Sequence, residues 1–380
     1  MPLNKYGTFP NGRINIFNHY ILFDDVAILD FSTCGHGVYD YGNLSRLFYQ
    51  RIDKSCYNAN LNEIDLSLGQ TEKAFSACEE IIKDKNIKHI FIMPSALSAT
   101  LGLDLNALCY DIKEKYNIEV STIFLNLNDD FYQAETYFYN NLYRYIKLES
   151  SEKYNLLGDE VTNSNILKHQ KIKKIIKEKS NLDCQFDSLD FNNLTDLQLS
   201  NRLNIITSKS ALELAKKMNI PYIFLNSLDE KNDELFFEKL NINITKKEKL
   251  DYIYFQFQNI IKMTQKRIIC YLNIDHLDML KNLFSNLNVP LELIATHKNN
   301  EYKYMNMDDF IDKYRNENAI YISNERVQKH LSNCIDFEYI GLDYKLLTPF
   351  EDTYIFYDSG LKLLEKIISL TPVVVTRKDQ

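Results

Sequence analysis

Val26-Ala-Ile-Leu-Asp-Phe-Ser-Thr-Cys-Gly-His-Gly37 is the stretch of the chain that decides the fold. Its apolar start, residues 26–29, has the composition of a buried strand and leads directly into a loop at residues 31–37. A second apolar run, residues 87–93, ends in a Ser/Ala-rich turn at residues 94–102. Helical patterns separate such strands, which predicts βαβ units and a parallel sheet. Both loops are therefore expected at the carboxyl edge of the sheet, where ligands bind.

The same alternation continues to the end of the chain. Helices are expected at residues 42–50, 71–83, 103–115, 131–145, 166–177, 246–264, 307–314 and 359–370, and strands at 118–125, 154–157, 203–206, 222–225, 267–272, 291–295 and 319–322. Ser210 is expected to cap a helix that ends near Met218. We predict an α/β fold of three successive Rossmann-like domains with parallel sheets, at residues 1–150, 151–263 (including a long spacer helix) and 264–380.

Composition narrows the class of protein. A chain of 380 residues is long enough for two or three domains, and 45% hydrophobic with 25% charged residues is ordinary for a globular protein. The net charge of −8 argues against nucleic-acid and anionic-membrane partners. Lysines recur at helical spacing in residues 168–179, where a solvated helix face is the expected interpretation.

No membrane segment or signal peptide is expected, because no apolar run is long enough to span a bilayer and the start of the chain lacks a basic segment followed by an apolar one. Seven cysteines without tight spacing fit a reducing compartment, so we expect a cytoplasmic protein. No GxGxxG, GxxxxGK[ST], CxxC or HExxH motif is present, which argues against an ordinary dehydrogenase or P-loop enzyme.

Aromatic residues gather in the helix expected at residues 131–145 and cover more than one of its faces. They are Phe131, Tyr132, Tyr137, Phe138, Tyr139, Tyr143 and Tyr145. Two interpretations stay open: the aromatics pack between elements of this chain, or they form an interface with a partner subunit.

Three landmarks follow one another in the first third of the chain. They are Phe31-Ser-Thr-Cys-Gly-His-Gly-Val-Tyr39, then Asn62-Glu-Ile-Asp-Leu-Ser-Leu-Gly-Gln70 before a helix, and then Ile90-Phe-Ile-Met-Pro-Ser-Ala-Leu-Ser-Ala-Thr-Leu-Gly-Leu-Asp-Leu105. In order and spacing the chain resembles the nitrogenase component 1 family, which includes molybdenum–iron protein subunits, cofactor scaffolds and nitrogenase-like reductases. A weaker similarity continues through Asn204-Ile-Ile-Thr-Ser and Met218-Asn-Ile-Pro-Tyr222.

The resemblance implies a cofactor site on the two loops, and this sequence departs from the family there. In direct register the family's first-loop cysteine falls on His36, and the third-landmark cysteine falls on Ala96, beside Ser95. Cys34 lies two residues from the expected position, and histidine can also bind iron of such clusters. The resemblance thus makes Cys34, His36 and Ser95 the candidate cofactor-binding residues, with Cys34 and His36 as candidate metal ligands. It assigns no catalytic residue.

The other departure lies after the strand at residues 203–206. Family members that hold the molybdenum cofactor use a cysteine there, whereas this chain has Thr207-Ser208-Lys209, so no molybdenum cofactor is expected. Core packing is the expected role of Cys78, Cys109, Cys184, Cys270 and Cys334, and Cys56 is left between core and site roles. The other six histidines form no metal-spaced pair and are given no role.

Three functions remain in competition. The first is a subunit of a heteromeric, anaerobic reductase, with an iron–sulfur cluster shared with a homologous component 1-like subunit (or a second copy) and an ATP-dependent iron-protein-like reductase as electron donor. Retention of Cys34, His36, Gly102 and Asp104 at one predicted edge favours it. The second is a non-catalytic scaffold or binding protein for a metal cofactor or tetrapyrrole, which the loss of cluster cysteines favours. The third is an unrelated α/β binding protein.

Overall fold

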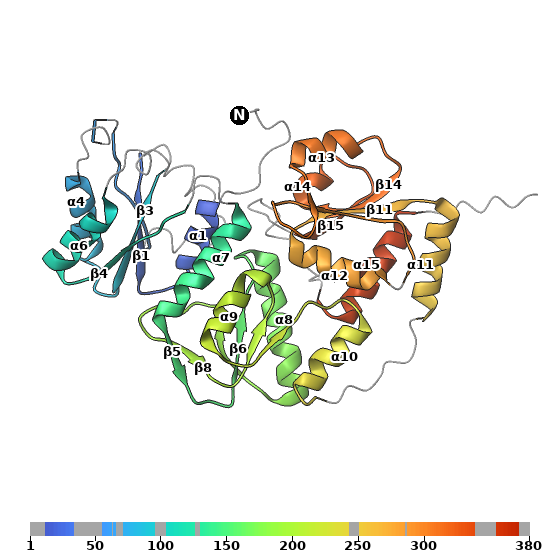
Figure 1. Ribbon diagram of the computed structural model, residues 1–380, viewed down its shortest axis with the longest axis horizontal. Coiled ribbons are helices and arrows are strands. Elements are labelled where there is room, and N and C mark those ends of the chain that lie inside the picture. Colours follow the sequence, from blue (N-terminus) through green and yellow to red (C-terminus); the bar gives the residue numbers. More distant parts are fainter. Residues whose placement is uncertain are drawn as a thin grey trace, which may run out of the picture.

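The computed structural model describes residues 12–33, 55–62, 64–65, 71–95, 104–125, 130–242, 251–285, 287–338 and 355–371. Within these residues the chain forms three parallel sheets of four or five strands, each with its own helices, and a small two-stranded sheet; we call each of the three larger sheets with its helices a unit. Figure 1 shows the first unit in blue on the left, the second in green at the lower centre and the third in orange on the right. The predicted α/β fold of successive Rossmann-like sheets is confirmed.

The first sheet is built around the buried strand at residues 26–31. Its strand order is β2-β1-β3-β4, with all pairs parallel. Its elements are α1 (Gly12–Tyr20), β1 (Val26–Phe31), β2 (Cys56–Asn58), α4 (Glu72–Ile81), β3 (His89–Pro94), α6 (Leu105–Tyr116) and β4 (Glu119–Thr122). All six residues of β1 are buried, because side chains alternate between two covered faces. Ala27 and Leu29 belong to the core beneath α4 and α6, whereas Val26 and Ile28 belong to the core that contains α1.

The second sheet has the order β10-β9-β6-β7, again all parallel. Its elements are β6 (Tyr154–Leu157), α8 (Asn163–Ser180), β7 (Cys184–Asp187), β9 (Asn204–Ile206), α9 (Leu212–Met218), β10 (Tyr222–Phe224) and α10 (Glu230–Lys239). A separate two-stranded ribbon pairs β5 (Ile146–Glu149) with β8 (Leu197–Ser200). The sequence patterns predicted β6, β9 and β10 but not β7, β5, β8 or α10.

The third sheet has the order β13-β12-β11-β14-β15. Its elements are α11 (Asp251–Thr264), β11 (Arg267–Leu272), α12 (Ile274–Ser285), β12 (Leu291–Ala295), β13 (Lys303–Tyr304), α13 (Met307–Tyr314), β14 (Ala319–Asn324), α14 (Glu325–Gln328), β15 (Cys334–Glu338) and α15 (Tyr357–Ser369). Helix α15 also reaches the second unit, where Lys171 of α8 donates a 2.7 Å hydrogen bond to Ser359. Buried side chains of both units form one continuous core. The domain boundaries at residues 150 and 263 stay a prediction.

Helix α7 (Phe131–Leu142) lies between the first and second units, with a 3₁₀ turn (Tyr143–Tyr145) after it (Figure 1). Two of its aromatics pack inside the chain. Phe138 stacks on His19 of α1 with 4.2 Å between ring centroids, and Tyr139 is fully buried. Tyr137 accepts a hydrogen bond from the backbone of Phe124, whereas Tyr143 is 47% exposed. Phe138 and Tyr139 thus pack in the core of this chain, whereas Phe131, Tyr132, Tyr137 and Tyr143 keep exposed surface, so the interpretation of this helix as a subunit interface stays a prediction.

In every sheet the first strand in sequence lies in the interior, with the next strand on one side and a later strand on the other. β1 lies between β2 and β3, β6 between β7 and β9, and β11 between β12 and β14. Where the winding direction reverses in this way, a crevice opens at the carboxyl ends of the strands, and open α/β sheets bind their ligands there. A ligand site is therefore expected at one or more of these three edges.

Candidate functional site

Loops at the carboxyl ends of the second and third sheets meet helix α7 in one buried polar cluster. We call this cluster the junction site, and it consists of Glu135, Asp159, Ser208, Ser210 and Asp275, all 6% exposed or less. Glu135 comes from α7, Asp159 follows β6, the two serines follow β9, and Asp275 follows β11. The junction site thus joins all three units at the place where the winding rule puts a ligand.

A glycine turn brings two of these loops together. Gly158 has a φ of +127°, a conformation that side chains disfavour, and a Cβ on it would lie 2.6 Å from the backbone nitrogen of Ser208. The space next to Gly158 is therefore occupied by the loop after β9. The backbone nitrogen of Asp159 donates a 3.0 Å hydrogen bond to Ser208 Oγ, which fixes the two loops against each other.

Glu135 is the buried acid at the centre of the site. Its Oε1 atom accepts hydrogen bonds from Ser210 Oγ at 2.6 Å and Ser208 Oγ at 3.0 Å. Burial raises the pKa of Glu135 to about 8; the serine hydrogen bonds oppose this shift, and the charges of Asp159 and Asp275 add to it. The carboxyl is therefore largely protonated near neutral pH.

Asp275 is the second acid of this kind. Its two carboxylate oxygens accept the backbone N–H of Lys209 at 3.1 and 3.2 Å. Burial, followed by the charge of Asp159, raises the pKa of Asp275 to about 7. Two carboxyl groups with pKa values near the working pH can each hold and release a proton, which is what general acid–base chemistry needs.

Asp159 stays charged because a buried ion-pair network surrounds it. Lys168 Nζ lies 2.5 Å from its carboxylate, and His169 Nε2 lies 3.1 Å from it. His169 Nδ1 lies 2.6 Å from Asp187. Burial raises the pKa of Asp159, but the charges of Lys168 and His169 outweigh it and lower that pKa far below its usual value. Burial lowers the pKa of His169, and Asp187 and Asp159 reverse this and raise it to about 9.

The sequence patterns missed these residues, although they carried a signal. Glu135 shares a helix face with Phe138, Tyr139 and Leu142, so an acid stands where spacing predicts an apolar residue. His169 was given no role, but it is 1% exposed and charged. Lys168 was assigned to a solvated face, but its side chain is 6% exposed because it pairs with Asp159.

Ser210 also differs from its prediction as a helix cap. A 3₁₀ turn (Lys209–Ala211) precedes α9, and the residue at the cap position is Ala211, which makes no side-chain cap bond. The hydroxyl of Ser210 binds Glu135 instead. Because the Ser210 hydroxyl binds a buried acid and not the backbone of a helix end, we assign Ser210 to the site.

The two loops that the sequence singled out begin side by side in the first sheet. Phe31 of β1 is paired with Pro94 of β3, and the backbone nitrogen of Ser95 donates a 3.2 Å hydrogen bond to Phe31. Ser95 is buried. Cys34 and His36 lie outside the described residues, as do Gly35 and Gly102. Asp104 accepts the backbone N–H of Ala107 and so caps α6, a structural role.

Described side chains at this edge do not fit an iron–sulfur cluster. Asp30 is fully buried and accepts hydrogen bonds from Ser32 at 2.6 Å and Asn58 at 3.0 Å. Arg13 pairs with Asp30 at 2.6 Å and also donates to the Pro94 carbonyl. Oxygen donors are poor substitutes for the thiolates that hold such clusters, and a guanidinium cannot bind a metal because it has no acceptor atom.

Six cysteines lie in the described parts of the chain, and none of them is exposed. Cys78, Cys109, Cys270 and Cys334 are buried, as predicted for core residues, and Cys184 lies partly buried in β7. Burial raises the pKa of the Cys56 thiol in β2 well above its usual value, which disfavours the thiolate form that metal binding needs. At the junction site no described residue supplies the thiol that anchors a molybdenum cofactor in the family.

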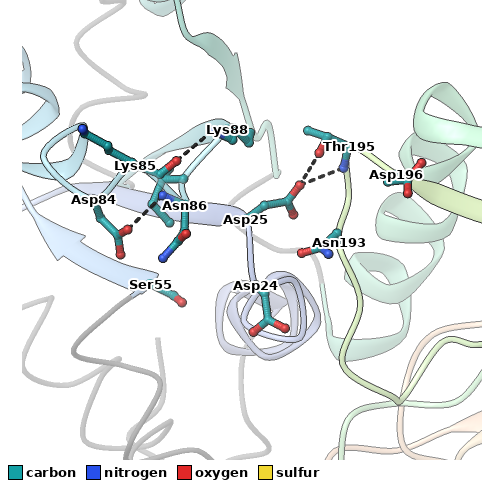
Figure 2. Close-up of a pocket in the computed structure, with 11 residues that line it drawn as sticks. Asp24, Asp25, Ser55, Asp84, Lys85, Asn86, Lys88, Asn193, Thr195 and Asp196 are labelled. Atoms are coloured by element: carbon teal, nitrogen blue, oxygen red, sulfur yellow. Dashed lines mark hydrogen bonds between the residues drawn. The ribbon is translucent and has the colours of Figure 1, made fainter.

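A pocket of about 710 Å³ lies away from the junction site, between the first and second units, and is shown in Figure 2. Its residues Asp24, Asp25, Ile87 and Lys88 precede β1 and β3, so it is at the amino edge of the first sheet, opposite the loops. The Asp25 carboxylate accepts hydrogen bonds from the backbone nitrogens of Leu194 and Thr195. We therefore interpret this pocket as part of a structural contact between the first and second units.

Parallel sheets covered by helices, two of which meet at a buried acidic junction, define the class: an open α/β protein. The model of the family "Nitrogenase component 1 type Oxidoreductase" matches residues 26–332, so the chain belongs to this family. The resemblance stated from the sequence is confirmed. In the described ranges, no helix is long and apolar enough to cross a membrane.

The chain is similar to known proteins both in sequence and in fold. The nitrogenase iron-molybdenum cofactor biosynthesis protein NifE of Clostridium pasteurianum is 31% identical over 71 residues, which cover 19% of this chain and only 16% of that relative. The solved structure of nitrogenase Cp1 at pH 6.5 matches with a TM-score of 0.72 at 14% identity, covering 100% of this chain and 96% of that one. Nitrogenase Cp1 at pH 5 matches with a TM-score of 0.60 at 10% identity, covering 97% and 90%. At these identities the structures support the fold alone.

Proposed function

We propose that this chain is a subunit of a heteromeric reductase that binds a small molecule at the junction site. Electrons would come from an ATP-dependent iron–sulfur protein through a homologous component 1-like subunit that supplies the cluster thiolates. The observation that carries the proposal is the pair of buried carboxyls, Glu135 and Asp275, whose pKa values of about 8 and about 7 suit proton transfer near neutral pH.

Reduction of most organic bonds adds a proton for each electron, so a reductase needs proton donors beside its substrate as well as an electron source. Glu135 can give its proton to a group in the junction site, and Ser210 then stabilises the carboxylate through the hydrogen bond of 2.6 Å. Asp275 has the same function on the side of the third sheet. Asp159 raises both pKa values and does not transfer a proton itself, because Lys168 and His169 keep it ionised.

An iron–sulfur cluster, when bound at a subunit contact, would supply electrons one at a time. Described residues of this chain do not supply thiolates for it, which is why the proposal places the cluster's ligands mainly on the partner. Cys34 and His36 are the candidates that this chain can add.

The test is electron transfer with and without the buried acid. The chain is co-expressed with component 1-like and iron-protein-like neighbours from its own genome, and ATP-dependent oxidation of the reduced iron protein is followed across pH. Glu135→Gln should leave complex formation intact and slow turnover at least tenfold, and the pH profile should lose its limb near pH 8. The exposed Glu114→Gln on α6 is the matched control. Unchanged turnover in Glu135→Gln would remove the proton-donor role.

A second candidate is a scaffold or carrier for a metal cofactor or tetrapyrrole. It is favoured by the similarity to NifE, whose name describes cofactor biosynthesis. The two functions separate in one measurement: a scaffold would bind and release its cargo without ATP-dependent turnover, and Glu135→Gln would change affinity rather than rate.

A further inference from the structure

A second pocket, of about 510 Å³, lies next to the junction site on the outer side of β10. It is bounded by α10 of the second unit and α12 of the third, helices that Figure 1 labels in different units. Lys209 lines this pocket with its side chain, while its backbone nitrogen binds Asp275 of the junction site. The pocket is thus at the carboxyl edge of the second sheet, where open α/β proteins bind ligands.

Three lysines and one carboxylate line the pocket, in a chain whose net charge is −8. The Lys209 ammonium is neutralised, because it lies 2.7 Å from both Asp278 and Glu301. Lys239 of α10 and Lys281 of α12 have no carboxylate partner among the described residues. They lie on helices of two units, and together they form a local positive site that attracts anions in an otherwise acidic protein.

Asn226 gives the pocket a polar group with an unmet hydrogen bond. Its Nδ2 atom donates to the Asp275 carbonyl at 3.1 Å, which fixes the orientation of the amide. Its Oδ1 atom is buried and has no hydrogen-bond partner in the part of the chain that the structure describes. An unpaired buried acceptor is costly, so this oxygen indicates a donor that the ligand brings. The buried side chains of Leu225 and Phe236 supply an apolar floor.

The geometry points to a binding site for a small organic dianion: two carboxylates for Lys239 and Lys281, and one neutral N–H or O–H for Asn226. The apolar floor favours an organic molecule over free phosphate, because phosphate has no apolar surface to bury. This inference goes beyond the proposed function. The pocket binds its anion in the isolated chain, without partner, ATP or reductant, so its failure and that of the reductase proposal are separate results.

N-acetyl-L-glutamate is the probe, because it has two carboxylates and one amide N–H. Calorimetric titration of the full chain at low ionic strength should show saturable binding. We expect affinity to fall about tenfold in the double variant Lys239→Gln/Lys281→Gln, since two exposed charge pairs are lost. It should be unchanged in Lys262→Gln/Lys266→Gln, which removes the same charge from α11 and the turn after it. All four lysines have exposed or half-exposed side chains, so these variants should fold.

Two further ligands separate the parts of the inference. N-acetyl-L-glutamine lacks one charge, and glutarate lacks the N–H, so each should bind more weakly than the probe. Inorganic phosphate that bound as tightly as the probe would overturn the assignment of an organic ligand. No binding of the probe to the wild-type chain, or equal binding by both double variants, would overturn the site itself.

Discussion

Ser210 Oγ donates a 2.6 Å hydrogen bond to Glu135 Oε1 and so connects the loop after β9 to the helix that leaves the first unit. Neither residue is more than 1% exposed. A buried acid beside a negative charge is expensive to ionise, even where two hydroxyl groups donate hydrogen bonds to it and offset part of the cost. Because Glu135 joins two units, its protonation state is expected to make the stability of the folded chain depend on pH.

Glu135→Gln should change how stability depends on pH. The pKa of Glu135 is raised from 4.5 to about 8 on folding, so the folded chain holds a proton that the unfolded chain releases between these values. The wild-type chain therefore loses stability as pH rises through that window, whereas the variant lacks this loss. Urea unfolding from about pH 5 to about pH 8 measures it, with Glu114→Gln as control. Parallel curves for wild type and Glu135→Gln would contradict the raised pKa.

His169→Gln tests the ion-pair network. The pKa of His169 is raised from 6.5 to about 9, so its stabilisation is complete below about pH 6.5 and is lost as pH rises through about 9. We expect a loss of about 3–5 kcal/mol in the free energy of unfolding at neutral pH, because two buried carboxylates lose a cation. The loss should shrink at high pH. His330→Gln, at an exposed position, should change stability by less than about 0.5 kcal/mol. A loss independent of pH would show that His169 is neutral.

Asp30→Asn tests the first sheet's edge. The carboxylate is fully buried and joins Arg13 of α1, Ser32 and Asn58, so its neutralisation removes the buried charge that lies 2.6 Å from the partly buried guanidinium. We expect a loss of about 3–5 kcal/mol. Glu80→Gln removes an exposed ion pair with Lys83 and should have little effect. Equal effects of the two substitutions, measured by thermal unfolding, would show that Asp30 does not hold the edge together.

Tyr139→Ser should unfold the chain rather than separate it from a partner. The ring is fully buried, and the hydroxyl accepts a 3.2 Å hydrogen bond from the Gly158 backbone. Removal of a ring of this size costs about 3–5 kcal/mol, and the Gly158 N–H then keeps only its bond to Ser188. Tyr143→Ser, at a half-exposed position, is the control. Dissociation of a complex by Tyr139→Ser without a change in unfolding temperature would support the interface interpretation.

The sequence predicted those helices and strands whose apolar residues recur with a clear helical or strand spacing. β6, β11, β12 and α13 begin and end where the patterns placed them, because the three strands are mostly apolar runs and α13 has its apolar residues at helical spacing. β7 was missed because Cys184-Gln-Phe-Asp187 is short and half polar, and its strand character comes from pairing with β6. α10 was missed because its sequence is mostly charged and only Phe236 and Phe237 are buried.

The candidate site was harder to predict, for a physical reason. Glu135, Asp159 and Asp275 lie far apart in the sequence, and they become a site only because the carboxyl edges of the second and third sheets meet helix α7 at one place. The sequence patterns placed their candidate residues at the carboxyl edge of the first sheet, where Phe31 and Ser95 lie, and that site stays a prediction. The raised pKa of Glu135 could not be predicted from the sequence, since it depends on burial and on the charge of Asp159.

The last prediction concerns iron. The chain purified alone without oxygen should hold no stable four-iron cluster, because such a cluster needs about four protein ligands and the relevant loops offer at most Cys34 and His36. The six other cysteines are buried or partly buried, and where their thiol pKa values are shifted, burial raises them, so they are poor substitutes. Near four irons per monomer with a reducible charge-transfer band would contradict this.

Co-expression with the homologous subunit extends the iron measurement to the complex. If the cluster lies at the contact, iron should appear in the co-purified complex and fall in Cys34→Ala, with no change in the unfolding temperature of the isolated chain. Cys78→Ala is the matched control, because that thiol is buried in the core of the first unit. It should lower the unfolding temperature and leave the iron content per folded complex unchanged. If the Cys34→Ala complex kept its full iron content, Cys34 would be excluded as a metal ligand. The cluster would then be held by His36, by the partner, or by both.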